Sequence, residues 1–561
     1  MLTTDFQTTD KLVASLIARL LVAHGIQRIV MSPGSRNAPL MVAVAREAAS
    51  VVSTVIVDER CAGFYALGQS LALNAPVAVI CTSGTALLNL APAVAEAYYR
   101  GVPLIVISAD RPSEWIDQDD SQTLKQPGAL ANFVKRTYDL TPDCCQQVAE
   151  REINDALLTS ISRRQGPVHI NVRLDTPLGG MTQASSLRPT RVISMSSGRD
   201  ELSAETMARL SDDARAADGI LIVAGYMHPD VATTNALRRL SSMPGVAVVA
   251  EPLSNISGAD IINRVEAATA ADHDYPSLVI TLGGALVSRR LKEYIRSTPT
   301  STSHWHVGHT HGTVDCYRRL THRVDVAEGP FLGALADELD GSVTGSWGAR
   351  WRSSCQLTAE RHDDYIGRAP WSDLRAMSLL LSMLPSDIHL HMSNGTAVRY
   401  AQMVDMPSVA SVDCNRGVSG IDGSTSTALG AASVYDTPTL LVTGDMSAQY
   451  DIGALASVDI PCGFRMVVLN NGGGAIFRTI ESTSRLEERT AFFDTPSRNA
   501  SASLRAVVEA VGMEWVSIDD EASFLDCMGD FLDGSDRPKV MEIVTDGAIS
   551  AAVMKELTSL K

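Results

Sequence analysis

Short apolar runs alternate with stretches of helical periodicity in the first third of the chain. The stretch TDKLVASLIARLLVAHG repeats its apolar residues at helical spacing, and the β-branched runs IQRIVMS, VAVICTS and PLIVISA follow it. Apolar runs of this length are typical of strands that are buried on both faces. Because strands that alternate with helices indicate a parallel sheet, we predict an α/β domain over residues 1–180.

The same alternation starts again twice. The run GILIVAG (219–225), with VAVVAE and LVITLGG, predicts a second domain over 200–345, and the runs DIHLHMS, PTLLVTG, RMVVLN and KVMEIVT predict a third over 370–561. The segment 179–203 is rich in Gly, Ser, Thr and Pro and is typical of a linker, whereas 347–371 indicates a charged helical connector. The predicted fold class is α/β, with three doubly wound parallel-sheet domains.

Composition supports a large enzyme and excludes several other classes. The 561 residues are 45% hydrophobic, which is enough for more than one core. A net charge of −17 argues against nucleic acid and anionic surfaces as partners, so an anionic substrate requires a local group of arginines.

The cysteines and the hydropathy indicate a reducing compartment. Nine cysteines, including the adjacent Cys144 and Cys145, form neither a disulfide framework nor a zinc pattern. The chain contains no apolar run long enough to span a membrane, and MLTTDFQTTDKL lacks the basic start and apolar stretch of a signal peptide. We therefore expect a cytoplasmic protein without a membrane span.

Polar residues follow two apolar runs in the last block. Asp445 comes after TPTLLVT, and Asn471 comes after FRMVVLN, with a helix-compatible stretch between the runs. A right-handed crossover places both residues at the carboxyl ends of neighbouring parallel strands. Asp445, Asn471 and the Gly473 carbonyl then offer the oxygen ligands that Mg²⁺ prefers, and the glycines at 472–474 admit a diphosphate. The alternative is an ordinary strand–turn–helix with an aspartate cap.

A second candidate lies near the amino end. Glu59 closes an apolar run and precedes a stretch of helical pattern with small residues at Ala62, Gly63, Ala66 and Gly68. Taken alone, Glu59 could be a solvated carboxylate that the helix dipole favours.

Together, these two elements resemble the cofactor-binding motifs of thiamine diphosphate enzymes. Further segments resemble one menaquinone-pathway branch of that family, the 2-succinyl-5-enolpyruvyl-6-hydroxy-3-cyclohexene-1-carboxylate synthases. The segments are MSPGSRNAPL (31–40), CTSGTALLNLAPAVAEAYY (81–99), ISADRP (107–112), DSQTLKQPG (120–128) and NRGVSGIDGSTSTALG (415–430). Since the matches run in order through nearly the whole chain, the resemblance is specific.

The resemblance implies thiamine diphosphate with Mg²⁺ or Mn²⁺ and the thiamine diphosphate-binding fold. It makes 1–180 the pyrimidine-binding domain, 200–345 the central domain and 370–561 the diphosphate-binding domain. It also implies that the first and last domains meet across subunits, so that a homodimer is the minimum active unit and a homotetramer the expected assembly. Glu59 would protonate the aminopyrimidine ring. The other cofactor-binding residues would be Asn394, Ile421, Asp445, Ser447 and Asn471, although Ile421 could equally be a core residue.

The implied reaction is a transferase reaction on two dicarboxylates, 2-oxoglutarate and isochorismate. The succinyl unit left after decarboxylation of 2-oxoglutarate adds to the isochorismate ring. Guanidinium groups pair with carboxylates in a bidentate manner. The resemblance assigns the substrate site to Ser35, Arg36, Arg111, Gln122, Arg289, Arg290, Arg399 and Arg416, with an apolar wall of Ile476, Phe477 and Ile480.

The sequence departs from the family in two places and offers one competing metal motif. Gly395 stands where a serine is usual, and Gly472 stands where a third asparagine is common. The segment SHWHVGHTHG (303–312) could hold zinc because alternate residues of a strand share one face. Since no cysteine or carboxylate lies in the segment, we interpret it as an exposed imidazole cluster.

Two alternative functions remain open. Another thiamine diphosphate-dependent decarboxylase or carboligase would use monocarboxylates and would not need so many arginines. A catalytically silent relative would have no reason to retain Glu59, Asp445 and Asn471 together.

Overall fold

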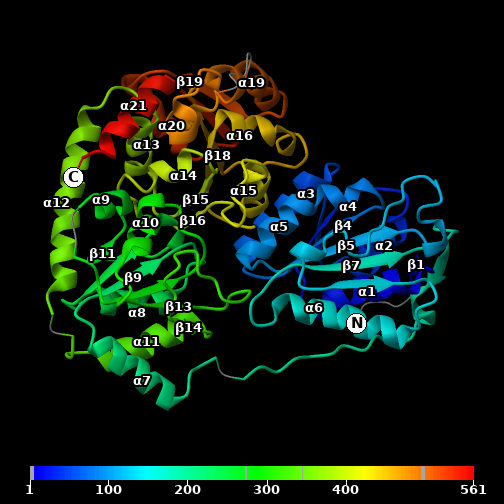
Figure 1. The fold of residues 1–561 in the computed structure, drawn as a ribbon. Coiled ribbons are helices and arrows are strands. Elements are labelled where there is room, and N and C mark those ends of the chain that lie inside the picture. The colour runs from blue at the N-terminus through cyan, green and yellow to red at the C-terminus, as the bar shows by residue number, and fades with distance from the viewer. Residues whose placement is uncertain (1–5, 199, 272–273, 344, 495–499, 561) are drawn as a thin grey trace. The chain divides into compact units, whose positions relative to one another are not determined.

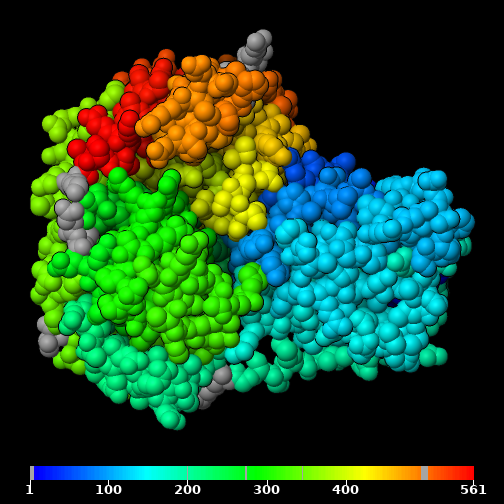
Figure 2. Space-filling view, viewed as in Figure 1, coloured from blue at the N-terminus to red at the C-terminus, as the bar shows by residue number. Residues whose placement is uncertain are grey.

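The computed structural model describes residues 6–198, 200–271, 274–343, 345–494 and 500–560 (Figure 1). The chain forms two compact units, which we describe separately. Unit 1 comprises Met1–Ser197, Asn415–Asp436 and Tyr450–Phe464, and unit 2 comprises Gly198–Cys414, Thr437–Gln449 and Arg465–Lys561. Within each unit, side chains fill the spaces between the ribbons, as the space-filling view shows (Figure 2).

The first sheet has six strands in the order β3-β2-β4-β5-β7-β6, and every adjacent pair is parallel. Its apolar central strands are fully buried, as the uninterrupted runs predict. The strands are β2 (Arg28–Met31), β3 (Val52–Val55), β4 (Val77–Cys81), β5 (Leu104–Asp110), β6 (Thr137–Leu140) and β7 (Val168–Arg173). The main helices are α1 (Leu12–Ala23), α2 (Ala38–Glu47), α3 (Glu59–Leu73), α5 (Ala91–Arg100) and α6 (Gln146–Ile161).

The last sheet repeats this topology. Its order, β16-β15-β17-β18-β20-β19, matches that of the first sheet strand for strand in chain order, as expected for a duplicated fold. The strands are β15 (His389–Met392), β16 (Ser411–Asp413), β17 (Thr439–Gly444), β18 (Phe464–Asn470), β19 (Glu514–Ile518) and β20 (Lys539–Val544). The helices of unit 2 near this sheet include α13 (Asp373–Ser382), α19 (Ala500–Ala510), α20 (Glu521–Leu532) and α21 (Gly547–Leu557).

The middle sheet has a different strand order, β11-β10-β9-β12-β13-β14, which is the order of dinucleotide-binding folds. All its adjacent pairs are parallel. The strands are β9 (Ile220–Ala224), β10 (Val246–Ala250), β11 (Ile261–Ile262), β12 (Leu278–Leu282), β13 (Ser303–Val307) and β14 (His322–Val324). The helices are α7 (Ala204–Arg215), α8 (Val231–Ser241), α9 (Val265–Ala270), α10 (Arg289–Ser297) and α11 (Glu328–Leu339). The predicted fold class, three parallel α/β sheets, is confirmed.

The predicted connecting segments are partly confirmed. The helical connector is α12 (Trp347–Arg368). The predicted linker is regular at its start, because β8 (Met181–Gln183) pairs antiparallel with β1 (Gln7–Thr9). The stretch between β17 and β18 holds only the short α16 (Asp445–Tyr450) and a 3₁₀ turn at Ile452–Ala454, rather than a full helix.

Helices α3 and α15 (Ser424–Ala432) pack backbone to backbone within unit 1. A Cβ atom at Gly68 would lie 2.0 Å from the Thr427 carbonyl oxygen, and one at Gly430 would lie 2.0 Å from the Tyr65 carbonyl oxygen. Neither position can carry a side chain without separating the helices. The small-residue pattern that follows Glu59 therefore has a structural cause, and this close contact fixes the helix that begins at Glu59.

The described residues contain no helix that is long and apolar enough to cross a membrane. All nine cysteines are free thiols. The amino-terminal segment that we compared with a signal peptide begins with residues 1–5, which lie outside the described residues.

Candidate active site

The loops after β15 and β17 meet at the point where the strand order of the last sheet reverses. In open α/β sheets, the carboxyl ends of the strands at such a point form the ligand crevice. Ser393, which follows β15, donates its backbone N–H to Val442 O over 2.9 Å, and its Oγ accepts from the Gly444 N–H over 3.3 Å. The next residue, Asn394, is buried. These bonds hold the predicted cofactor residues Asn394 and Asp445 at one edge of the sheet.

Asp445 is the first residue of α16, and only 5% of its surface is exposed. Burial raises the pKa of this carboxyl to about 7, with a smaller contribution from the charge of Asp373, while the Met446 and Gly473 backbone N–H groups act in the opposite direction. Taking a carboxylate out of water is unfavourable unless an opposite charge compensates it. A divalent cation at this position would supply that charge.

Asn471 follows β18, the neighbour of β17. Its Nδ2 donates to Asp373 Oδ2 over 2.7 Å, whereas its buried Oδ1 has no hydrogen-bond partner among the described residues. A buried acceptor without a partner lowers the stability of the folded protein. The bond from Nδ2 to Asp373 fixes the direction in which Oδ1 of the same amide points. Gly472 and Gly473 follow at φ +83° and +127°, conformations that favour glycine.

The donor set fits a hard cation on a diphosphate. Asp445 offers a buried carboxylate, Asn471 offers an unpaired amide oxygen, and the glycine turn offers the Gly473 carbonyl, which are the ligand types that Mg²⁺ or Mn²⁺ uses. No group of three His, Cys, Asp or Glu side chains in the described part of the chain could hold a metal ion. A metal ion held here would therefore depend on these mixed oxygen donors.

Glu59 begins α3 in unit 1. The Asp58 side chain caps the helix by accepting from the Arg60 and Cys61 N–H groups, and Asn89 Nδ2 donates to Glu59 Oε2 over 3.3 Å. Glu59 also lies close to the end of β4, since burial and then the charge of Glu59 raise the pKa of Cys81. The carboxyl is half-buried and retains acceptor capacity toward a ligand.

A buried carboxylate ties the start of α3 to α15. Asp451 is fully buried and accepts from the Ser426 N–H over 2.7 Å and from the Ser426 hydroxyl over 3.0 Å. Arg60, next to Glu59, lies 3.6 Å from it. Burial raises the pKa of Asp451 to about 6. Sequence reasoning missed Asp451 because its partners come from distant segments of the chain.

Four predicted substrate residues lie on loops at the carboxyl ends of the first sheet. Arg36 is buried and donates to Leu174 O over 2.8 Å, and burial together with the nearby Arg111 charge lowers its pKa. Arg111 pairs with Asp120. Gln122, in a left-handed conformation at φ +54°, donates to Ser83 O over 3.0 Å, and Ser35 is exposed. The structure thus brings these two guanidinium groups near each other, and the charges of Asp120 and Asp110 oppose the effect of Arg111 on Arg36.

A buried amide that sequence reasoning missed supports this edge. Gln126 Oε1 accepts from the Gly84 N–H over 2.8 Å, while its Nε2 donates to Asn171 Oδ1 over 2.9 Å. The bonds join the loops after β4 and β5 to β7. The QPG triplet that contains Gln126 was part of a matched segment, and this was the only signal that could have found it.

Comparisons with known proteins agree with this geometry. Residues 11–129 match the family model described as "Thiamine pyrophosphate enzyme, N-terminal TPP binding domain". The chain is 38% identical to the 2-succinyl-5-enolpyruvyl-6-hydroxy-3-cyclohexene-1-carboxylate synthase of Porphyromonas gingivalis, over 98% of this chain and 97% of the relative. The chain belongs to this synthase family. The synthases of Bacteroides thetaiotaomicron and Christiangramia forsetii are 35% and 32% identical, over 98% and 97% of this chain and 98% of each relative.

The remaining predicted residues of this synthase-family chain lie in varied surroundings. Ile421 is 39% exposed, so it is not a core residue. Arg290 donates to Thr558 O and lies 3.9 Å from Glu266, whereas the Arg289 side chain is 81% exposed and bonded to Glu293. Arg399 donates to Gly395 O, and Arg416 is half-buried. Ser447 is buried. The turn after the glycines is half-buried at Ile476, Phe477 and Ile480.

The two departures from the synthase family have conformational explanations. Gly395 has φ +103°, where an L side chain such as that of serine would be strained. Gly472 at φ +83° lies in a region that glycine adopts freely and asparagine tolerates. The turns at both positions thus suit glycine.

Asp373 is a further residue that sequence reasoning missed. It begins α13, is fully buried, and accepts from Thr545 Oγ1 and Asn471 Nδ2, with Tyr400 Oη at 3.3 Å. Asparagine has no charge and one acceptor oxygen fewer, so Asn471 Nδ2, Tyr400 Oη and Thr545 Oγ1 compete for the remaining oxygen and the Asn471 amide is held less firmly. Since loss of such supporting bonds costs about 10–100-fold in metal affinity, we expect Asp373→Asn to weaken Mn²⁺ binding by that factor.

Titration with Mn²⁺ followed by electron paramagnetic resonance measures this effect. Thr545→Val is the matched control, because it removes a bond to the other Asp373 oxygen and leaves Asn471 untouched. Equal Mn²⁺ affinity in wild type and Asp373→Asn, with native circular dichroism, would contradict the positioning role.

The histidine segment is not an exposed cluster, so that interpretation was wrong. His304 is 1% exposed, and its strand β13 lies between β12 and β14 in the sheet. His304 Nε2 and His306 Nδ1 both form a hydrogen bond with Thr281 Oγ1. His309 lies between two carboxylates, with Nε2 2.6 Å from Asp200 and Nδ1 3.0 Å from Asp325. The two carboxylates come from outside the segment and bond to different nitrogens of the His309 ring, so among the described residues these three groups do not converge on a metal ion.

The pKa of His309 predicts a pH-dependent stability. Burial opposes its charge, but the hydrogen bonds and charges of Asp325 and Asp200 raise the pKa above its usual value. A raised histidine pKa contributes stability that is fully present below about pH 6.5 and is lost as the pH rises through the folded-state pKa. We expect His309→Gln to cost about 0.5–1 kcal/mol at pH 6 and less at pH 9, because both carboxylates are partly exposed.

Urea unfolding at the two pH values checks this expectation. His322→Gln is the control, because burial lowers the pKa of His322 and its replacement should not produce the same loss at low pH. A destabilisation by His309→Gln that does not change with pH would exclude an ionic role for His309.

Proposed function

We propose that the chain is a transferase that decarboxylates 2-oxoglutarate and joins the succinyl unit to isochorismate by conjugate addition. The products are carbon dioxide and 2-succinyl-5-enolpyruvyl-6-hydroxy-3-cyclohexene-1-carboxylate, in menaquinone biosynthesis. Thiamine diphosphate with Mg²⁺ or Mn²⁺ is the proposed cofactor. The proposal rests on full-length similarity to synthases of that name and on the site described above.

One observation carries most of the weight. A buried aspartate and an asparagine with an unpaired buried oxygen lie after neighbouring strands, beside a glycine turn. An ordinary strand–turn–helix would need neither the buried charge nor the orphaned acceptor, and both are expected where a cation binds a diphosphate.

The residues divide the work among binding, proton transfer and water exclusion. Asp445, Asn471 and the Gly473 carbonyl would hold the metal, with Asn394 and Ser447 beside the diphosphate. When bound, thiamine diphosphate supplies the electron sink for decarboxylation and the nucleophilic carbon for the addition. Glu59 would hold a proton on its carboxyl for the aminopyrimidine ring, and Ile421 would support the ring conformation.

The arginines would bind the substrate carboxylates. Arg36, Arg111 and Gln122, together with Ser35, form one group, and Arg289, Arg290, Arg399 and Arg416 form the rest of the proposed set. Half-buried Ile476, Phe477 and Ile480 would keep water from the reacting carbon.

We also propose the assembly and location of the enzyme. Resemblance to the family favours a homodimer at least, and a homotetramer as the working form. We place the enzyme in the cytoplasm, in keeping with nine free thiols.

Substrate choice tests the proposal against other thiamine diphosphate enzymes. With cofactor and Mg²⁺ present, 2-oxoglutarate should be consumed in an isochorismate-dependent reaction, and pyruvate should not be consumed. Turnover of pyruvate at a comparable rate would instead assign the chain to decarboxylases or carboligases of monocarboxylates.

We expect Arg111→Gln to raise the KM of at least one dicarboxylate substrate about 10–100-fold. A hydrogen bond to a charged group contributes about 1.5–3 kcal/mol, and each 1.4 kcal/mol is a factor of ten. Steady-state kinetics with each substrate varied in turn measures this change. Arg136→Gln, which removes an exposed arginine paired with Asp155 in the same unit, should leave both KM values unchanged. If Arg111→Gln behaves in the same way, Arg111 does not bind substrate.

A further inference from the structure

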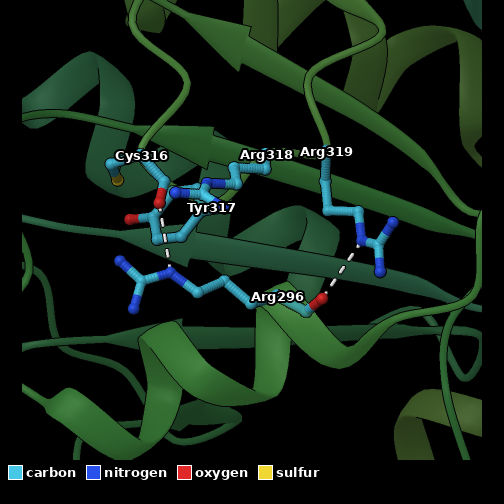
Figure 3. A pocket seen from close by; sticks show the side chains of 5 residues that line it. All are labelled: Arg296, Cys316, Tyr317, Arg318 and Arg319. Carbon is cyan, nitrogen blue, oxygen red and sulfur yellow. Dashed lines mark hydrogen bonds between the residues drawn. The ribbon is translucent and has the colours of Figure 1, made fainter.

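A hollow of about 620 Å³ lies beside the middle sheet and is lined by Arg296, Cys316, Tyr317, Arg318 and Arg319 (Figure 3). Arg296 is in the last turn of α10, and the other four residues belong to the loop between β13 and β14. The loop returns to the start of β13, because the Thr321 N–H donates to His304 O over 2.8 Å. The hollow is therefore at the amino ends of the strands, away from the carboxyl ends where the crevice of such a sheet lies.

Hydrogen bonds to backbone carbonyl groups hold two of the three arginine side chains, those of Arg296 and Arg319. Arg296 Nε donates to Cys316 O, and Arg319 Nε donates to Arg296 O, each over 3.1 Å (Figure 3). Arg318 has φ +59°, and the Asp315 carboxylate accepts from the Arg319 and Leu320 N–H groups, which shapes the turn. The two Nε bonds leave the outer guanidinium nitrogens of Arg296 and Arg319 for another partner.

None of the three arginines has an ion pair with a carboxylate in the part of the chain that the structure describes. Other arginines of the same unit do, for example Arg239 with Asp337 and Arg264 with Asp363, each at 2.7 Å. Arg296 and Arg318 are exposed and Arg319 is half-buried, and the nearby Asp315 carboxylate bonds to backbone N–H groups rather than to a guanidinium group. Three arginines without a carboxylate ion pair thus line one hollow in a chain with a net charge of −17. A helix-end cation would explain Arg296 alone but not the pair on the loop.

We propose that this hollow is a binding site for an oligophosphate group, separate from the proposed catalytic site. A phosphate chain offers several oxygens and at least two charges, which match the planar donor forks of more than one arginine. A single carboxylate would leave at least one guanidinium group unpaired. The hollow has the volume of small-molecule sites.

Calorimetric titration of the full chain with inorganic pyrophosphate, in EDTA to remove metal, tests the proposal. We expect saturable binding that weakens at least tenfold in the Arg296→Gln/Arg318→Gln/Arg319→Gln variant and decreases as salt is raised. Arg239→Gln is the control for loss of one positive charge from the same unit, and it should bind as the wild type does. Succinate should bind at least tenfold more weakly than pyrophosphate.

Several results would overturn the proposal. These are an absence of pyrophosphate binding, equal binding in the triple variant, or equal affinity for succinate. Binding that survives in the triple variant and disappears in Asp445→Asn would assign pyrophosphate to the other site. If the triple variant does not fold, the single Arg319→Lys and Arg296→Lys variants replace it, and unchanged affinity in both would count against the site. Activity with the proposed substrates is measured separately, so either proposal can fail alone.

Discussion

Replacing Glu59 with glutamine should reduce the rate of the synthase reaction by about 10²–10⁴-fold, the range for loss of a general acid or base. Glutamine has the same shape, and its amide oxygen can still accept from Asn89 Nδ2, so the local contact survives. It cannot hold a proton for exchange. The turnover number should therefore fall while the cofactor still binds.

The loss of folding free energy in Glu59→Gln should be small, and a control variant can reproduce it. Glu59 is in the first turn of α3, where the helix dipole favours a negative charge by about 0.3–1 kcal/mol. Glu205→Gln is the control, because it removes a charge from the first turn of α7. It should lose a similar amount of stability and keep the wild-type activity. Turnover by Glu59→Gln at more than a tenth of the wild-type rate would remove Glu59 from the proposed proton transfer.

Replacing Asp445 with asparagine should abolish metal-dependent binding of thiamine diphosphate. The substitution removes the only carboxylate of the proposed metal ligands and keeps its shape. Because the wild-type carboxylate is buried, its neutral replacement should not lower the melting temperature of the metal-free protein. Lost binding combined with unreduced stability is a result that simple misfolding cannot produce.

Calorimetric titration with thiamine diphosphate at fixed Mg²⁺ measures cofactor affinity. Thermal unfolding in EDTA measures the melting temperature of the metal-free protein. Asp451→Asn is an informative comparison, since it also replaces a buried aspartate but removes the negative charge 3.6 Å from Arg60 of α3 and one of the two acceptor oxygens that Ser426 of α15 uses. That variant should lose stability. Wild-type cofactor affinity in Asp445→Asn would show that the metal binds elsewhere.

The apolar pattern predicted the sheets because buried parallel strands are uninterrupted runs of β-branched residues. The same pattern predicted that Asp445 and Asn471 follow neighbouring strands, since consecutive parallel strands joined by a crossover usually lie side by side. It overestimated the helix between them. The pattern alone does not show that the helix ends at Tyr450. The next residue, Asp451, is buried and accepts a hydrogen bond from Ser426.

The supporting residues could not be predicted, because their partners are distant in the chain. Asp373 and Asn471 are 98 positions apart, and only the folded sheet shows that they share a hydrogen bond. The prediction of an exposed histidine cluster at 303–312 was wrong for a related reason. Alternation along β13 indicates two faces, but the neighbouring strands and helices decide that His304 is buried.

The loss of isochorismate, followed spectrophotometrically with 2-oxoglutarate, thiamine diphosphate and Mg²⁺, tests the proposed function most directly. We predict that isochorismate is consumed only when all components are present, with one carbon dioxide released for each molecule consumed. If isochorismate persists while 2-oxoglutarate or pyruvate is still decarboxylated, the thiamine diphosphate site stands and the synthase reaction is contradicted.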